Sequence, residues 1–181
     1  PNVVRRLQAW GLQKPLQAVA AFPQALVSRN AMTGQALARL DLGAHAVARY
    51  GAAYVTIHRA DLHQLLLDTV RPSADLHLNL DNPVDYHEDN GRVVTITTKQ
   101  GKTIEGDALI VAVVIWSRTR LRLLHDAPPR VTGHLAYRAL VRHADLPAAL
   151  RTDVVTAWMG PRFHAVQYPV RGGELQNLVI I

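Results

Sequence analysis

The end of the sequence, residues 154–181, constrains the fold most. It contains the runs VVTAWM, RFHAVQYPV and LQNLVII, separated by GP and RGGE. Val, Ile, Tyr and Phe favour strands, whereas Gly and Pro interrupt them. Strand-like runs that are joined by short glycine turns pair as antiparallel neighbours. The sequence therefore predicts three antiparallel strands here.

Two other segments have the apolar spacing of helices. VVRRLQAWGL follows Asn2, which we expect to cap it, and it ends at Gly11 with Pro15 preventing its continuation. RADLHQLLLDTVR, residues 59–71, has leucines on one helical face and is followed by Pro72. Both segments are predicted to be helices.

The middle of the chain returns to strand patterns. LHLNLD, residues 76–81, alternates apolar and polar side chains, VVTITT is β-branched, and KQGK is a hairpin turn. SRTRLRLL then predicts a helix with Ser117 at its N-cap, and GHLAYRALV predicts another strand. Helices mixed with strands and followed by a run of strands indicate α/β material interrupted by an antiparallel sheet, an α/β (α+β) fold.

Composition limits the classes of protein that remain. The chain has 181 residues, of which 49% are hydrophobic, so it can form one domain or parts of two. No stretch approaches the roughly 18 apolar residues of a membrane span, and Cys is absent, which excludes disulfides and fits a cytoplasmic protein. The net charge of +6 suits either an anionic partner or an ordinary basic surface. Nucleic-acid binding would rest on this charge alone.

Several common catalytic motifs are missing from the sequence. None of the serines lies in G-x-S-x-G, and neither H-E-x-x-H, a Walker loop nor G-x-G-x-x-G occurs. His58 and His63 are five residues apart, which places them on different faces of a helix. The sequence thus predicts neither a serine hydrolase nor a metal site, and it contains no complete nucleotide site of its own.

Three features remain as candidate binding groups. Arg59 follows a strand and opens a helix, where a guanidinium can meet an anion, and Ser117 with Arg118 and Arg120 repeats that arrangement. The third feature is a set of aromatic, His and Arg side chains on predicted strands, which can line a pocket for a planar anionic ligand or belong to an ordinary half-exposed sheet. This set consists of His134, Tyr137, Arg138, His164, Gln167, Tyr168 and Arg171.

Four stretches together resemble the single-component FAD-dependent aromatic-ring hydroxylases, which include salicylate, 3-hydroxybenzoate and 6-hydroxynicotinate hydroxylases. They are PNVVRRLQAWGL, YVTIHRADLHQLLLDTV, GDALIVAVVIWSRTRLRLL with TGHLAYRALV, and YPVRGGELQNLV. The resemblance implies a Rossmann-like FAD-binding domain interrupted by a β-sheet substrate domain. It assigns residues 1–20 and 50–125 to the partial FAD-binding domain, and residues 21–49 and 126–181 to the partial substrate domain.

The resemblance also implies an activity and its residues. NADH or NADPH reduces FAD, O2 adds to give a flavin hydroperoxide, and one oxygen is transferred to a small aromatic acid or phenol. Arg59 of HRADL matches the family arginine that contacts FAD, and Ser117 is the second cofactor-binding candidate. Tyr137 of AYR and, with a less diagnostic spacing, His134 are the candidates for the catalytic pocket. The expected form is a cytoplasmic enzyme, with a homodimer as the candidate assembly.

One motif departs from the family pattern. The family has Gly-Ala-Asp-Gly before IWS, whereas this chain has Val111, Ala112, Val113 and Val114. The acid accepts hydrogen bonds near the cofactor, and glycine allows a close backbone approach that β-branched valine obstructs. The family's glycine-rich loop and later Gly-Asp segment are expected outside residues 1–181, as for an internal fragment. The alternative is therefore a catalytically incompetent fragment or remnant that retains an aromatic-ligand binding sheet.

Overall fold

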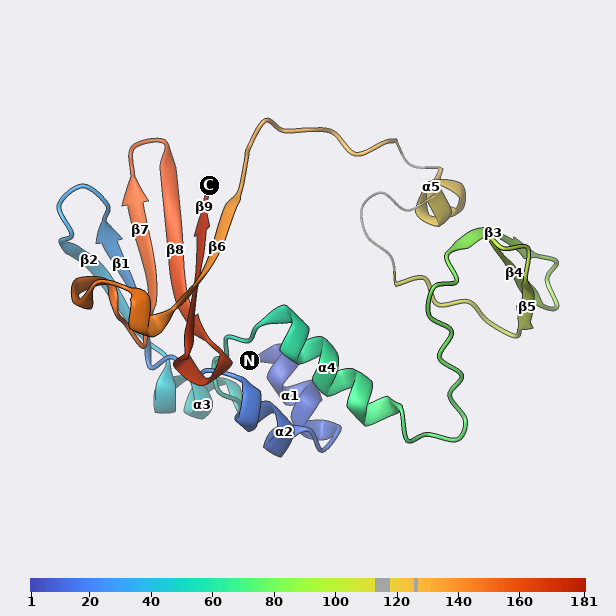
Figure 1. Ribbon diagram of the computed structural model, residues 1–181, viewed down its shortest axis with the longest axis horizontal. Helices are drawn as coiled ribbons and strands as arrows, with labels where there is room; N and C mark the ends of the chain where they lie inside the picture. The colour runs from blue at the N-terminus through green and yellow to red at the C-terminus, as the bar shows by residue number, and fades with distance from the viewer. Residues whose placement is uncertain (113–117, 126) are drawn as a thin grey trace. The chain divides into compact units, whose positions relative to one another are not determined.

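A six-stranded sheet organises most of the chain in the computed structural model, which describes residues 1–112, 118–125 and 127–181. Its strand order is β2-β1-β7-β8-β9-β6 (Figure 1). The three antiparallel strands predicted at the end of the chain are confirmed, because β8 pairs antiparallel with both β7 and β9. The strands are β1 (Ala25–Asn30), β2 (Ala36–Asp41), β6 (Tyr137–Arg142), β7 (Val155–Gly160), β8 (Phe163–Val170) and β9 (Leu175–Ile180).

One strand pair in this sheet is parallel. β1 runs in the same direction as β7, with Leu26 opposite Val155, whereas β2, β8, β9 and β6 pair antiparallel with their neighbours. A parallel pair requires a long connection. Here the connection runs from residue 31 to residue 154 and includes β2 and β6.

Helices pack together at one end of this sheet (Figure 1). α1 (Asn2–Ala9), α2 (Gln13–Val19) and α4 (Arg59–Val70) bury a shared apolar cluster, and α3 (Gly43–Tyr50) follows β2. The cluster exists because each helix places leucine or valine at helical spacing on one face. Its buried members are Val4, Leu7, Leu12, Leu16, Ala20, Ala52 and Leu65.

Two details of the first helices were predicted wrongly. Asn2 is inside α1 and makes no capping hydrogen bond, because Pro1 takes the N-cap position. Pro15 lies in the first turn of α2, where the missing N–H costs nothing, so it opens a second helix and does not simply end the first. Gly11 does end the first helical segment, with a left-handed φ of 75°.

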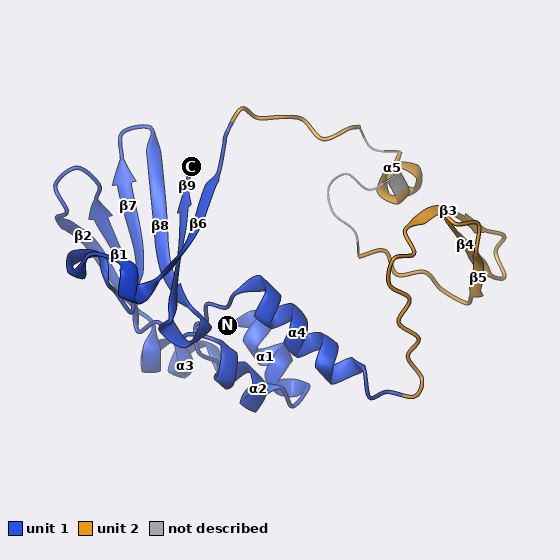
Figure 2. Ribbon diagram, viewed as in Figure 1, with its two compact units in different colours: residues 1–73, 134–181 blue, residues 74–133 orange. Residues whose placement is uncertain are grey.

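Residues 74–133 form a compact unit separate from residues 1–73 with 134–181 (Figure 2). This smaller unit contains β3 (Val84–Asp89), β4 (Val94–Thr98) and β5 (Thr103–Gly106), an antiparallel meander, and α5 (Arg118–Leu124). The guanidinium of Arg122 lies 4.7 Å from the ring centre of Tyr86. The strand predicted at 76–81 is absent from the described residues, because this alternating segment has no partner strand.

The observed class is mixed α/β with a large sheet and a second antiparallel sheet, as predicted. Two short 3₁₀ segments, η1 (His143–Asp145) and η2 (Ala148–Leu150), connect β6 to β7, and η3 (Arg171–Gly173) connects β8 to β9. The division into FAD and substrate domains stays a prediction. Among the helices of the described residues, none has the length and apolar character needed to cross a membrane.

Candidate cofactor and substrate site

The start of α4 is the first part of the candidate site. A bridge between Ala21 and Thr56 holds the extended segment before α4, and the Thr56 hydroxyl donates to the Pro169 carbonyl of β8. His58 then occupies the N-cap with φ −69° and ψ 135°, and no side chain caps the helix. The first N–H groups of α4 therefore lack a side-chain acceptor, as is required where a helix start binds an anion.

Arg59 is the first residue of α4 and is exposed. Within the part of the chain that the structure describes, its guanidinium has no hydrogen-bond or ion-pair partner. A guanidinium of this kind has its fork of N–H donors available for an oxygen-rich anion. Arg59 begins a helix, as predicted, but the segment before it holds one isolated bridge and is not a strand. Contact of Arg59 with FAD stays a prediction.

Asp61 connects the same helical turn to the large sheet. Its carboxylate accepts from Arg171 at 2.8 Å (Nη2) and 3.1 Å (Nε), a bidentate pair in which the Asp61 side chain is 17% exposed. The hydrogen bonds from Arg171 lower the pKa of Asp61 below its usual value, against the opposing effect of burial, and the charges of Arg171 and His58 add to the lowering. This ion pair fixes the start of α4 against the β8–β9 turn.

The β8–β9 turn has an unusual backbone. Arg171, Gly172 and Gly173 have φ values of 51°, 63° and 98°, so three successive residues are left-handed. A side chain at Gly172 or Gly173 would meet no atom within 4 Å. The two glycines are thus required by backbone conformation and not by space. Arg171 adopts the same region as a non-glycine residue while its side chain is held by Asp61.

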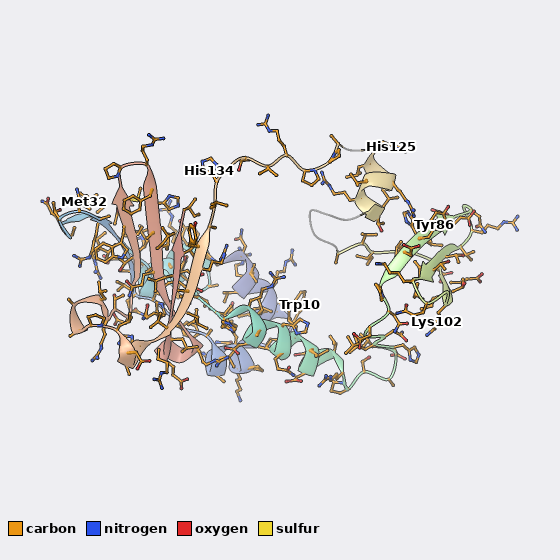
Figure 3. The ribbon with its side chains drawn as sticks, turned by 45° about the horizontal axis from the view of Figure 1, so that its top comes forward. Trp10, Met32, Tyr86, Lys102, His125 and His134 are labelled. Carbon is orange, nitrogen blue, oxygen red and sulfur yellow. The ribbon has the colours of Figure 1, made fainter. Side chains whose placement is uncertain are left out.

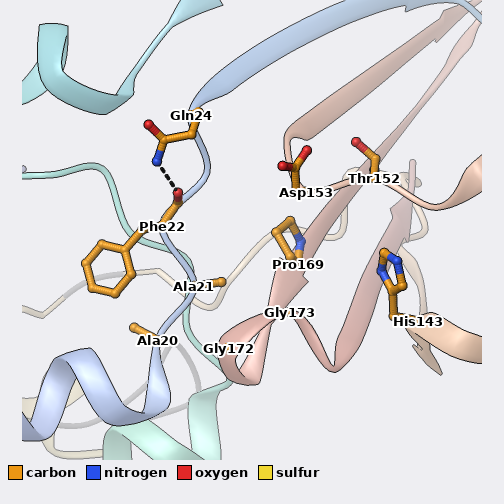
Figure 4. A pocket seen from close by; sticks show the side chains of 10 residues that line it. All are labelled: Ala20, Ala21, Phe22, Gln24, His143, Thr152, Asp153, Pro169, Gly172 and Gly173. Atoms are coloured by element: carbon orange, nitrogen blue, oxygen red, sulfur yellow. Dashed lines mark hydrogen bonds between the residues drawn. The ribbon is translucent and has the colours of Figure 1, made fainter.

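A cavity of about 340 Å³ lies beside this turn (Figure 4). Its lining residues include apolar ones and others that carry amide, hydroxyl, imidazole and carboxylate groups. Its size falls within the range of small-molecule sites. The lining residues are Ala20, Ala21, Phe22, Gln24, His143, Thr152, Asp153, Pro169, Gly172 and Gly173.

Two buried glutamines attach the connection between β6 and β7 to the sheet. Gln167 donates from Nε2 to the Leu150 carbonyl at 2.6 Å, and Gln176 donates to the Thr152 carbonyl at 2.6 Å. Gln176 also places Nε2 3.2 Å from Nδ1 of His143. The segment between β6 and β7 is therefore attached to one face of β8 and β9 by side-chain amides.

The strand register separates the polar side chains that the sequence suggested for a pocket. Gln167 faces Leu178, which pairs with Ala139, so Gln167 shares a face with Tyr137, two residues away on β6. His164, Tyr168 and Arg138 have the opposite parity and lie on the other face. The strand residues of the proposed set are therefore divided between two faces of the sheet and cannot all line one pocket.

The predicted catalytic residues do not line the described cavity. Tyr137 is 66% exposed on the edge strand β6, and His134 lies on the segment that leads into β6 (Figure 3). Ser117 lies outside the described residues, as do Val113 and Val114. Val111 is partly buried and lines a separate cavity of about 560 Å³ within the smaller unit.

Several residues of this region were not predicted from the sequence. Asp61 stands two positions after Arg59, and Gln176 is a polar residue inside the apolar run LQNLVII; either could have been singled out from its position. His143 and Asp153 carry no comparable signal, because they reach the cavity only through the path of the β6–β7 connection.

The fold of the chain is shared with solved protein structures. Klebsiella pneumoniae HpxO, solved with FAD and uric acid, superposes on all of the chain with a TM-score of 0.87 at 22% identity, using 45% of its own length. At this identity the likeness establishes the fold. No family model matches the sequence.

Curated enzymes of known reaction are more similar to the chain in sequence. The 3-hydroxybenzoate 6-hydroxylase 1 of Aquipseudomonas alcaligenes is 33% identical over 181 residues, which is 99% of this chain and 46% of that protein. The 6-hydroxynicotinate 3-monooxygenase of Pseudomonas fluorescens is 34% identical over 173 residues, 95% of this chain and 44% of that protein. The chain is a homologue of these flavoprotein monooxygenases and spans less than half of their length, so the resemblance seen in the sequence is confirmed.

The described residues fit an anionic part of FAD at one place. The uncapped start of α4 with the unpaired Arg59 guanidinium is suited to a phosphate or other oxygen-rich group. The valines at the Gly-Ala-Asp-Gly positions supply neither a carboxylate nor glycine's backbone freedom. Among these residues, Arg59 and the start of α4 are therefore the groups suited to an anionic part of FAD.

Proposed function

We propose that this chain is part of an FAD-dependent monooxygenase that consumes NADH or NADPH and hydroxylates a small aromatic acid or phenol. The observation that carries the proposal is the unpaired Arg59 at the uncapped start of α4, in a chain whose relatives are aromatic hydroxylases. The resemblance supplies the reaction class, and Arg59 supplies a physical reason for cofactor binding by these residues.

Each side of the site has a proposed task. Arg59 neutralises and orients an anionic group of FAD, and Ser117 is a second cofactor contact. Tyr137 and His134 lie on the substrate side, where they would orient a ring hydroxyl and favour its deprotonation. The chemistry that FAD supplies when bound is reaction with O2 after reduction by NADH or NADPH, by way of the flavin hydroperoxide expected from the resemblance. A homodimer in the cytoplasm is part of the same proposal.

A second candidate function is supported by the three valines at the family's Gly-Ala-Asp-Gly positions. In that case the chain is a catalytically incompetent fragment or remnant that binds aromatic ligands through its sheet. It would bind an aromatic compound without oxidising NADH. Aromatic-stimulated NADH oxidation by the FAD-loaded chain would exclude this candidate.

Replacing Arg59 tests the cofactor role. We expect FAD to co-elute with the wild-type chain and Arg59→Ala to weaken FAD binding about 10- to 100-fold, the usual effect of losing a hydrogen bond to a charged group. The dissociation constant is measured by quenching of flavin fluorescence.

Arg92→Ala is the matched control, because Arg92 is exposed on the β3–β4 hairpin and the substitution removes the same charge. Its FAD affinity should equal that of the wild type. A wild-type chain that stays colourless after incubation with FAD contradicts cofactor binding by these residues. Equal losses in both variants would mean that only general charge attraction is involved.

A further inference from the structure

Strand β2 forms one edge of the large sheet. Among the described residues its only partner strand is β1, and all six of its side chains are exposed (Figure 1). Such an edge can pair with a further strand unless its side chains prevent the approach. The sequence of β2, ALARLD, contains neither Pro nor Lys, which often block an edge. The bulge opposite Ser28 and Arg29 leaves residues 38–41 of β2 in regular register with β1.

The outward-facing backbone groups of this edge belong to Arg39 and Asp41. Leu42 donates its N–H to the Gln24 carbonyl at 2.8 Å and so continues the register of the β1–β2 pair. Residues of an antiparallel pair alternately face the neighbouring strand and turn away from it. Leu40 therefore faces β1 with its N–H and C=O groups, whereas Arg39 and Asp41 turn theirs outward.

The two charged side chains of β2 have opposite signs and share one face. Arg39 Nε donates to the Asp41 carboxylate at 2.9 Å, and these side chains are 58% and 71% exposed. Leu40, between them, lies on the other face and is 57% exposed. A base and an acid two positions apart make the strand complementary in charge to an antiparallel copy of itself.

A twofold axis through Leu40 brings these groups together. About this axis, Arg39 of one copy lies opposite Asp41 of the other, and the symmetric pair forms on the other side of the axis. The outward N–H and C=O groups of the same residues then face each other, so each pair can form two backbone hydrogen bonds. Leu40 of one copy meets Leu40 of the other, which covers exposed apolar surface.

The opposite edge of the sheet, β6, lacks this complementarity. Its sequence, YRALVR, contains two arginines and no acid, and Arg142 is paired with Asp145 outside the strand. Pairing of β6 with a second β6 would bring two basic strands together without a carboxylate between them. Of the two edges, β2 is therefore the one suited to a second copy of the chain.

We propose that two copies of this chain associate through their β2 edges and join their large sheets into one continuous sheet. The proposal rests on the proposed function only in that a homodimer is part of it, since the contact requires neither FAD nor an aromatic compound. Each copy contributes one short strand, so the dimer is weak, with a dissociation constant on the order of 100 µM.

Sedimentation velocity of the wild-type chain, from about 10 µM to about 1 mM, measures this association. We expect a shift from monomer to dimer as the concentration rises. Over the same range, hydrogen exchange at the amides of Arg39 and Asp41 should slow, whereas the Leu40 amide, which faces β1, should not change. A monomer at every concentration, or protection confined to other strands, would overturn the proposal.

Reversing one charge at a time tests the register. Arg39→Glu places acid opposite acid and Asp41→Lys places base opposite base, so each variant alone should dimerise about tenfold more weakly than the wild type. An equal mixture of the two variants should regain dimerisation, because each carboxylate then faces a cation of the other chain. Both side chains are exposed, so the variants should fold. A mixture that associates no better than its components would contradict the pairing.

Leu40→Lys tests the axis, because it places two ammonium groups against each other, and it should abolish the dimer. Leu140→Lys is the matched control: it makes the same change on β6, where Leu140 is 45% exposed, and should leave the dimer intact. Equal losses in both variants would refute the β2 interface. Failure of the wild-type chain to bind FAD, with an intact dimer, would refute the cofactor function alone, whereas a dimer that persists in Leu40→Lys would refute this interface alone.

Discussion

At the scale of single residues, the pair Asp61 and Arg171 connects two parts of the candidate site. Its two hydrogen bonds join the first turn of α4, which carries Arg59, to the left-handed turn that borders the cavity. Because the guanidinium is held at two atoms, it restrains orientation as well as distance. This contact therefore restrains both the start of α4 and the turn beside the cavity.

The pH dependence of stability reports on this pair. Arg171 lowers the folded-state pKa of Asp61 below its ordinary 3.8, so the contribution to stability is fully present above that pH. It is lost as the pH falls below 3.8 through the folded-state pKa. We expect Asp61→Asn to be less stable than the wild type at pH 6 and the difference to shrink progressively below pH 4. Urea unfolding followed by circular dichroism at each pH measures it.

The matched substitution Asp75→Asn should leave the free energy of unfolding unchanged at pH 6, because Asp75 is exposed. If the difference between Asp61→Asn and the wild type grows as the pH falls, the assigned direction of the pKa shift is wrong.

At the scale of elements, burial of apolar side chains stabilises the helices more than N-terminal capping does. α1, α2 and α4 lack capping hydrogen bonds from side chains at their N-termini, and they share the cluster built around Leu7, Leu16 and Leu65. Short helices are marginal in isolation, so packing must supply most of their stability. The cluster therefore supplies most of the stability of these three helices.

Leu16→Ala tests this dependence. Leu16 is buried, so its truncation should lower the free energy of unfolding by about 2–5 kcal/mol through lost apolar burial and the cavity left behind. Leu37→Ala removes the same atoms from an exposed position on β2 and should change stability by less than about 0.5 kcal/mol. Similar losses in both variants would show that the helical cluster is not the main core.

Local patterns predicted much of the element structure. Residues 154–181 have glycine turns at both strand junctions, so their three strands and pairing followed from sequence. Residues 76–81 alternate in the same manner but find no partner strand, and alternation alone does not reveal that. The same limit applies to the site. Arg59 could be predicted at the start of a helix, whereas the Asp61–Arg171 pair and the Gln176 contacts depend on how distant segments fold together.

At the scale of the whole molecule, the two compact units differ in how well they are packed. The buried apolar side chains of the described residues belong to the larger unit, whereas Thr98 is the buried residue in described parts of 74–133. A unit with little buried apolar surface opens at low free energy. Residues 74–133 should accordingly be the less stable part of the chain.

Native-state hydrogen exchange measures this difference. Amides in β7 and β8 should exchange about 100-fold more slowly than those in β3 and β5, because the former open only when the larger unit unfolds. Equal protection of both sheets would show that residues 74–133 and the larger unit unfold as one cooperative body.

The parallel pairing of β1 with β7 also sets a sequence of events during synthesis. The β1–β2 hairpin leaves the ribosome early. The edge of β1 that pairs with β7 stays unpaired until Val155 and its neighbours have been synthesised. Until then this strand edge can pair with other chains, a hazard that unprotected edges share. A nascent chain stopped before β7 should therefore require a chaperone, whereas one that includes β9 can close the sheet by itself.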